Sequence, residues 1–273
     1  QAQVQMEAVW GGQPRGKLPA TALSKSNCGI RVYLEQFLGI RFPATIESLY
    51  PRFFVTVRLA LETIVRRAQG ENRRVTSDEA EQIFARAFPD DEPLGHAHYK
   101  IYRRKGAAYA ARFARAYEPQ PHALEFFDTE DLINRAEDEL LPLRLDLVTY
   151  YRGEAGQAHA ILFRPESFEK KSKNGTELAW SSVEGTTRKR MSFVLLRKLD
   201  ANLRPWIYSG EDGKIYEYKW NSRNPTAMDD DAAWAKGRLK AFSRGRFETV
   251  VDEFICDTRC RCRVPCPFWM KAI

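Results

Sequence analysis

Four of the five cysteines in this chain lie among its last eighteen residues, where their thiolates could bind a metal. They are Cys256, Cys260, Cys262 and Cys266, in the pattern Cys-x3-Cys-x-Cys-x3-Cys, and the fifth, Cys28, lies near the other end. Sets of four thiolates hold zinc ions or iron–sulfur clusters. One thiolate from the start of a fold and three from its end would join the terminal segments through a metal centre.

The spacing of these cysteines favours an iron–sulfur cluster over zinc. Structural zinc usually takes pairs of Cys-x2-Cys or mixtures of Cys and His, and neither spacing occurs here. An odd number of cysteines without a secretory signal also argues against a disulfide framework. We therefore expect a structural [4Fe–4S] cluster. The alternatives are a zinc ion, or an arginine-rich tail without metal.

A carboxylate and a lysine lie two residues apart in the strand-like run Lys-Ile-Tyr-Glu-Tyr-Lys-Trp of residues 214–220. Side chains at i and i+2 share one face of a strand, so Glu217 and Lys219 are expected together, with Tyr216 and Tyr218 on the packed face. A carboxylate can hold a divalent cation that polarises a phosphate, and a lysine can then orient the attacking water. The ordinary alternative is an ion pair on a sheet surface.

Mg²⁺ or Mn²⁺ needs a second carboxylate to complete its oxygen shell. Asp200 lies upstream of Glu217, across an expected hairpin, and is the preferred candidate. Asp146 is its rival, because it lies in an alternating apolar run that is also typical of a strand. The apolar run after Asp146, residues 158–163, has no acid-x-Lys pair, so we favour Asp200.

The arrangement Asp200-x16-Glu217-Tyr-Lys219 resembles the D…(D/E)-x-K signature of the PD-(D/E)XK nuclease superfamily. Cys28 and the terminal cysteines are similar to its RecB-like branch with an iron–sulfur cluster, which includes the AddB nuclease domain. In that branch one cysteine precedes the nuclease core, and three follow it as C-x2-C-x5-C. Cys260 and Cys266 match this spacing, whereas the preceding interval is one residue longer and Cys262 is extra. The resemblance covers about residues 24–268.

The resemblance implies an α/β fold, restriction-endonuclease-like, with a mixed central sheet flanked by helices and terminal segments joined by a metal cluster. It implies that Asp200, Glu217 and the Tyr218 carbonyl bind Mg²⁺ or Mn²⁺, that His98 in Gly-His-Ala-His is an extra ligand, and that Lys219 positions the water. The cluster ligands it implies are Cys28, Cys256, Cys260 and Cys266, with Cys262 as the alternative. Two features depart from the family: the helix at 51–68 has no histidine, and no downstream Gln-x3-Tyr follows.

The function this predicts is a metal-dependent DNA nuclease, an exonuclease on single strands or DNA ends, in repair, recombination or CRISPR adaptation. One alternative is a non-catalytic DNA-binding or scaffold subunit of the same fold. A second is a zinc-stabilised interaction module unrelated to nucleases. A helicase or other protein subunits are the protein partners implied.

Charge is consistent with a polyanionic partner. The chain has 43 Lys and Arg against 36 Asp and Glu, a net charge of +7, and such a balance favours phosphate binding. The candidate DNA contacts are Arg188, Lys189, Arg190, Arg259, Arg261 and Arg263. The sequence contains no run of about 18 apolar residues, so it predicts no membrane-spanning helix. No secretory signal pattern is visible, so we expect an intracellular location: cytoplasm or nucleoid, or a eukaryotic nucleus or mitochondrion.

The elements that must position these residues follow from hydrophobic periodicity. Helices are expected at 24–39, 51–68, 77–88, 97–117 and 232–254; strands at 143–147, 158–163, 191–199, 205–208 and 214–220; loops at 169–185 and 221–231. We expect a loose arm at 1–20, a nuclease-like domain at 21–254 and a cluster-binding tail at 255–273. Within the domain, a helical part at 21–118 precedes a sheet-rich core at 119–254.

Overall fold

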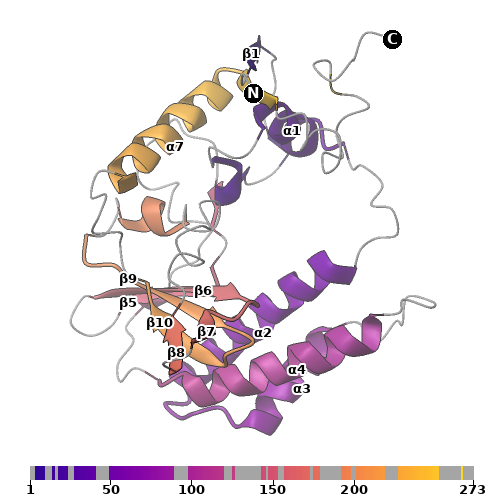
Figure 1. Ribbon diagram of the computed structural model, residues 1–273, viewed down its shortest axis with the longest axis vertical. Coiled ribbons are helices and arrows are strands. Elements are labelled where there is room, and N and C mark those ends of the chain that lie inside the picture. The colour runs from indigo at the N-terminus through magenta and orange to yellow at the C-terminus, as the bar shows by residue number, and fades with distance from the viewer. Residues whose placement is uncertain are drawn as a thin grey trace.

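The computed structural model describes fifteen stretches of the chain. They are residues 4–9, 14–15, 18–23, 28–40, 49–88, 98–119, 125–126, 143–145, 147–152, 157–172, 175–178, 192–197, 201–218, 227–251 and 266. Within them the protein is α/β, with a mixed sheet flanked by helices (Figure 1). The coarse fold class expected from the sequence is thereby confirmed.

A five-stranded sheet lies at the centre, in the order β10-β9-β6-β5-β3. Its strands are β3 (Glu125–Phe126), β5 (Thr149–Arg152), β6 (Ala158–Arg164), β9 (Arg204–Ser209) and β10 (Lys214–Glu217). The pair β6–β9 is parallel, and the other three pairs are antiparallel. A parallel pair needs a long crossover connection; here the connection contains the β7–β8 hairpin (Glu169–Ser172 and Gly175–Leu178) and a helix at 192–197.

Three consecutive helices form a layer against one face of this sheet: α2 (Leu49–Gly70), α3 (Ser77–Ala87) and α4 (Tyr99–Ala116) (Figure 1). Their start and stop signals are local. Thr76 caps α3 in a reciprocal capping box with Glu79, which satisfies backbone N–H groups that the first turn leaves unpaired. The buried stripes of these helices meet β6 and β9 in one apolar cluster, here called the helical-layer core. Its largest fully buried members are Phe84, Phe113, Tyr208 and Leu61.

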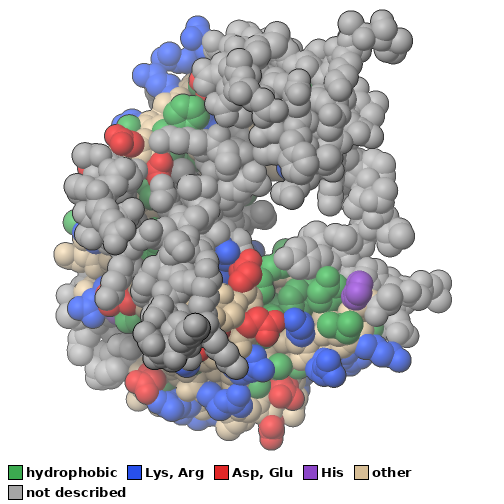
Figure 2. All heavy atoms as spheres, viewed as in Figure 1, with side chains coloured by type: hydrophobic (Ala, Val, Ile, Leu, Met, Phe, Trp, Pro, Cys, Tyr) green, Lys and Arg blue, Asp and Glu red, His purple; other side chains and the backbone are tan. Residues whose placement is uncertain are grey.

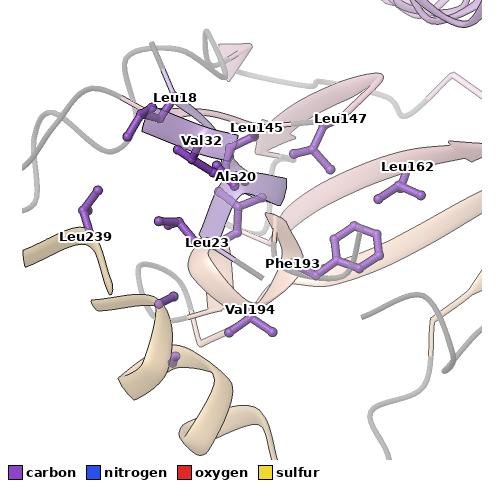
Figure 3. Close-up of a cluster of buried hydrophobic side chains, with 14 of the residues drawn as sticks. Leu18, Ala20, Leu23, Val32, Leu145, Leu147, Leu162, Phe193, Val194 and Leu239 are labelled. Carbon is purple, nitrogen blue, oxygen red and sulfur yellow. The ribbon is translucent and has the colours of Figure 1, made fainter. Parts of the chain in front are cut away.

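The other face is covered by pieces from distant parts of the chain (Figure 1). They are η1 (Ala20–Leu23), α1 (Gly29–Val32) continuing as the π-helix η2 (Tyr33–Phe37), the helix at 192–197, and α7 (Ala227–Ser243). Their buried side chains form the terminal-layer core. Figure 3 shows Leu18, Leu23, Leu145, Leu162, Phe193, Val194 and Leu239 in this cluster.

Two small sheets complete this second layer. Strand β11 (Arg246–Val251) pairs antiparallel with β1 (Val4–Val9), and β2 (Leu18–Pro19) pairs parallel with β4 (Leu143–Arg144). The loose arm expected at 1–20 is therefore wrong for residues 4–9 and 18–19. Residues 4–8 alternate between apolar and polar types, a strand pattern that the expectation overlooked, and their pairing partners lie far away in the sequence.

Three further expectations at 169–254 differ from the structure. The run 191–199, expected as a strand, is helical at 192–197, since a short buried apolar run has no period that separates strand from helix. The polar segment 169–185 contains the β7–β8 hairpin rather than loop alone. The helix expected at 232–254 begins earlier and ends at Ser243, where Gly245 with φ 71° turns the chain into β11.

The remaining helices expected before residue 118 are confirmed within one to five residues of their ends. Strand β6 and the β9–β10 hairpin are also confirmed, and Gly213 takes the positive φ of 64° that the turn requires. No helix in the described part of the chain is long and apolar enough to cross a membrane.

Candidate metal centre and nucleic-acid site

Cys28 lies where the N-terminal segment meets the terminal-layer core. It is half-buried at the N-cap of α1, and its carbonyl accepts a hydrogen bond from Val32 N at 3.1 Å. Its side chain packs against the terminal-layer core, and so does that of the half-buried Cys266. The structure thus brings one cysteine from each end of the chain to the same core cluster.

Helix α1 is fixed directly against β11. A Cβ on Gly29 would lie 2.4 Å from the Glu248 carbonyl oxygen, so only glycine permits this approach. In the sequence, Cys256 follows the end of β11 by five residues. The glycine after Cys28 therefore allows the first cysteine to lie beside the strand that leads into the cysteine-rich segment.

Arg238 of α7 supplies a buried positive charge near Cys28. Its side chain is buried, and its guanidinium lies 5.3 Å from the ring centre of Phe242. Burial lowers the pKa of Arg238, while the nearby Glu248 carboxylate and Cys28 thiol act in the opposite direction. A cation at this position would offset part of the negative charge that thiolate ligands bring to a metal centre.

Glu217 is the last residue of β10 and is exposed, because β10 is the edge strand of the sheet. Its neighbours follow the expected alternation: Ile215 packs against the helical-layer core, and Tyr216 packs against the terminal-layer core. Tyr218 is 5% exposed, and its backbone N donates to the Pro205 carbonyl at 2.8 Å. The run thus has one packed tyrosine face, as the sequence predicts.

A cavity of about 480 Å³ lies beside Glu217, where the starts of β6 and β9 meet the end of β10. Arg197 and Arg204 line it together with Glu217. The Arg197 guanidinium donates to the carbonyl of Leu203, another residue of the lining, at 3.4 Å. Guanidinium groups match phosphate oxygens, and a carboxylate suits a divalent cation, so this cavity could hold a phosphate and a metal together.

Residues on both sides of Asp200 line the same cavity: Arg197 before it, and Asn202 and Leu203 after it. Asp200 itself lies outside the described residues. His98, by contrast, is an exposed residue at the N-cap of α4, and it is not among the described residues that line the cavity.

A carboxylate in the turn of the β9–β10 hairpin that carries Glu217 helps to hold this hairpin against α4. Glu211 accepts hydrogen bonds from Lys105 Nζ at 2.8 Å and Tyr109 Oη at 2.7 Å. These contacts, led by that of Lys105, hold the pKa of Glu211 below its ordinary value. Burial and Glu211 raise the pKa of Tyr109, so its hydroxyl stays a hydrogen-bond donor.

His159 lies in β6 next to this region and was not singled out by the sequence. Its ring stacks on Tyr151 at 5.1 Å, and its Nδ1 accepts a hydrogen bond from Trp206 Nε1 at 3.3 Å. Burial, and then the charge of Arg204, lower the pKa of His159. The imidazole is therefore held neutral in the sheet, which is a structural role.

Most of the other expected site residues fall outside the described residues. They are Asp146, Arg188, Lys189, Arg190, Lys219, Cys256, Arg259, Cys260, Arg261, Cys262 and Arg263. Among the residues that the structure does describe, no three His, Cys, Asp or Glu side chains gather as a metal-binding group. The residues that sequence reasoning missed are Arg197 and Arg204, because single arginines on separate elements leave no spacing signal.

Comparison with models of known protein families found no match, and comparison with curated proteins found none either.

Proposed function

We propose that this protein is a metal-dependent DNA nuclease of the PD-(D/E)XK type, RecB-like branch, whose terminal segments are joined by a structural [4Fe–4S] cluster. The observation that supports the proposal is that Cys28 and Cys266, from opposite ends of the chain, both pack against the terminal-layer core. A metal centre that joins the terminal segments requires cysteines from both ends in the same layer. The cluster ligands are Cys28, Cys256, Cys260 and Cys266, with Cys262 as the alternative and zinc as the alternative metal.

The catalytic part of the proposal rests on the cavity beside Glu217. Glu217 and Asp200 bind Mg²⁺ or Mn²⁺, with help from the Tyr218 carbonyl, and Lys219 positions the attacking water. Arg197 and Arg204 line the same cavity and suit the phosphate of the cleaved strand. The substrate is DNA, as single strands or duplex ends. The position of His98 outside the cavity lining gives its role as a metal ligand no support.

The first test is elemental analysis for iron, sulfide and zinc in protein purified without oxygen. Iron with matching sulfide supports the cluster, whereas stoichiometric zinc or no metal overturns it.

The second test measures cleavage of labelled DNA with Mg²⁺ or Mn²⁺ by the wild type and by Glu217→Gln. The variant keeps the shape of the side chain but loses its charge, so cleavage should fall at least about 100-fold while DNA affinity is kept. Equal cleavage by both proteins would exclude this active site.

A second candidate function is a non-catalytic DNA-binding or scaffold subunit of the same fold. It is favoured by the charges around Glu217: among the described residues that line the cavity, the other charged groups are Arg197 and Arg204, both cations. Such an environment binds a phosphate more readily than a divalent metal. DNA binding that is indifferent to Mg²⁺, with no product from any DNA substrate, would select this candidate over the nuclease.

A further inference from the structure

Helix α4 carries a concentration of positive charge that the proposed active site does not use. It contains six Lys and Arg residues and no Asp or Glu: Lys100, Arg103, Arg104, Lys105, Arg112 and Arg115. Figure 2 shows blue side chains along the course that α4 takes in Figure 1. A helix that is basic along its length, without acidic partners at i+3 or i+4, repels itself and gains no ion-pair stabilisation of its own.

Near the end of α2 and in the turn after it, by contrast, arginines form ion pairs with carboxylates. In α2 and the turn that follows it, Arg66 pairs with Glu62 at 3.0 Å, and Arg67 pairs with Glu71 at 2.8 Å. Arg73 pairs with Glu79 of α3 at 2.7 Å. These arginines are balanced locally by carboxylates, so they add little to the field outside the protein.

On α4 the exposed cations Lys100 and Arg104 have no carboxylate within ion-pair distance in the described part of the chain. Arg115 donates to the Ser77 hydroxyl at 3.1 Å, which orients the guanidinium but leaves its charge unbalanced. Arg112 is similarly oriented by the Gly210 and Glu211 carbonyls, both at 3.1 Å. Arg112 and Arg115 are therefore positioned by neutral acceptors, whereas Lys105 of the same helix is paired with Glu211 at 2.8 Å.

Helical geometry places three of these cations in one line. Lys100 and Arg104 are one turn apart, and Arg115 follows Arg104 by three further turns, so all three lie within about 60° of arc on the helix. The line is about 22 Å long. A nucleic-acid strand carries about one phosphate for each 3.4 Å of helix axis, so several phosphates fit along it.

An open cavity of about 560 Å³ extends this line at its C-terminal end. Arg112, Arg115 and Lys214 line it. The cavity also contains Asp212, but that carboxylate accepts hydrogen bonds from Ser167, the Phe168 backbone N–H and Tyr216. Lys214 is paired with Glu169 at 2.6 Å, so the two arginines share this cavity with one carboxylate, Asp212, and leave it with an excess of positive charge.

We propose that the face of α4 defined by Lys100, Arg104 and Arg115 binds the phosphate backbone of a nucleic-acid strand. None of these three residues lines the cavity at Glu217. The identification of the bound strand as DNA rests on the proposed function. The role of this face is to hold the strand irrespective of base sequence, because it offers cations to phosphates and no groups aimed at base edges.

The test compares two triple variants of the full chain, K100Q/R104Q/R115Q on α4 and R66Q/R67Q/R73Q on the paired set. Both remove three positive charges from exposed positions, so their net charge is identical. Affinity for a fluorescein-labelled single-stranded oligonucleotide and for a duplex is measured at several salt concentrations. The α4 variant should bind at least about 10-fold more weakly, with a salt slope smaller by about 2, and the paired-set variant should stay within about twofold.

Three outcomes decide the inference. An α4 variant that binds like the wild type overturns it and leaves the proposed function standing. Equal weakening of both variants shows that net charge alone acts, which also overturns it. A wild type that binds no DNA removes the inference together with the proposed DNA substrate. Far-ultraviolet circular dichroism and a thermal melt of each variant verify that the affinities compare folded proteins.

Discussion

The two faces of the central sheet are covered in opposite ways. The helical layer comes from one continuous stretch, residues 49–116, whose three helices all contact each other. The terminal layer is assembled from segments near both ends of the chain together with the crossover helix at 192–197. Local contacts close short loops at small entropic cost, whereas joining the chain ends closes a loop of more than two hundred residues. Under the proposed function, the cluster offsets this cost in the terminal layer, whereas the helical layer needs no such cross-link.

The largest expected effect comes from removing that cross-link. Cys28→Ser should abolish iron binding and lower the free energy of unfolding by about 5 kcal/mol, the order expected when a very long closed loop is opened. Hydrogen exchange should report the loss mainly in α1, α7 and β11, with α2–α4 retaining their protection. Metal content is measured beside the unfolding free energy.

Cys262→Ser is the matched control for Cys28→Ser, because Cys262 is the extra cysteine in the pattern. It should keep both the iron and the stability of the wild type. If Cys28→Ser keeps its iron, or if both layers lose protection equally, then the two layers do not differ in the way proposed here.

The second-largest effect is expected from the substitution Gly→Ala, made once in each layer to compare their packing. A Cβ on Gly106 of α4 would lie 2.0 Å from Phe84 Cζ, and Phe84 is fully buried in the helical-layer core. A Cβ on Gly237 of α7 would meet nothing within 4 Å. Gly106→Ala should destabilise by about 1–2 kcal/mol, because overpacking outweighs the gain in helix propensity, and Gly237→Ala should stabilise by about 1 kcal/mol. Urea denaturation at one pH measures both, and equal signs would contradict the packing described.

The same division decides what the sequence could predict. The periodicity of residues 51–68 and the cap at Thr76 are local signals, so the helical layer was predictable almost to its ends. Tertiary partners that lie far away in the sequence decide the strand pairs β1–β11 and β2–β4 and the helix at 192–197. Whole elements were missed in the terminal layer, in the crossover connection and in the central sheet, where no strand was expected at β3 or β5.

In the candidate site, too, some features could be predicted from the sequence and others could not. The alternating faces of β10 follow from strand geometry, and Glu217 is exposed at its end. A shared metal site for Cys28 and the terminal cysteines was inferred from residue type, spacing and the family resemblance. Of these cysteines the structure describes Cys28 and Cys266, which both pack against the terminal-layer core. Arg197 and Arg204 could not be found, because they meet Glu217 only when β6, β9 and β10 lie side by side.

The smallest expected effect is a pH dependence that belongs to the helical side of the sheet. His159 alternates along β6 with Ala160 and so shares a face with Ile161 of the helical-layer core. Its pKa is lowered in the folded protein, chiefly by burial, so the unfolded chain binds more protons just below the ordinary value of 6.5. Stability must then fall as the pH drops from 6.5 toward the folded pKa, by no more than about 1.4 kcal/mol for each pH unit.

The variant His159→Gln distinguishes the effect of protonating His159 from that of protonating other groups in acid. Glutamine can still accept the hydrogen bond from Trp206 but cannot take up a proton. The unfolding free energy of the variant should therefore fall less than that of the wild type between about pH 7.5 and about pH 5.5. Parallel pH profiles for the two proteins would mean that the acid sensitivity arises elsewhere. Cys28 lies in the opposite layer, so the iron content of His159→Gln should equal that of the wild type over the same pH range. The substitution then changes a protonation on the helical side of the sheet without affecting the terminal layer.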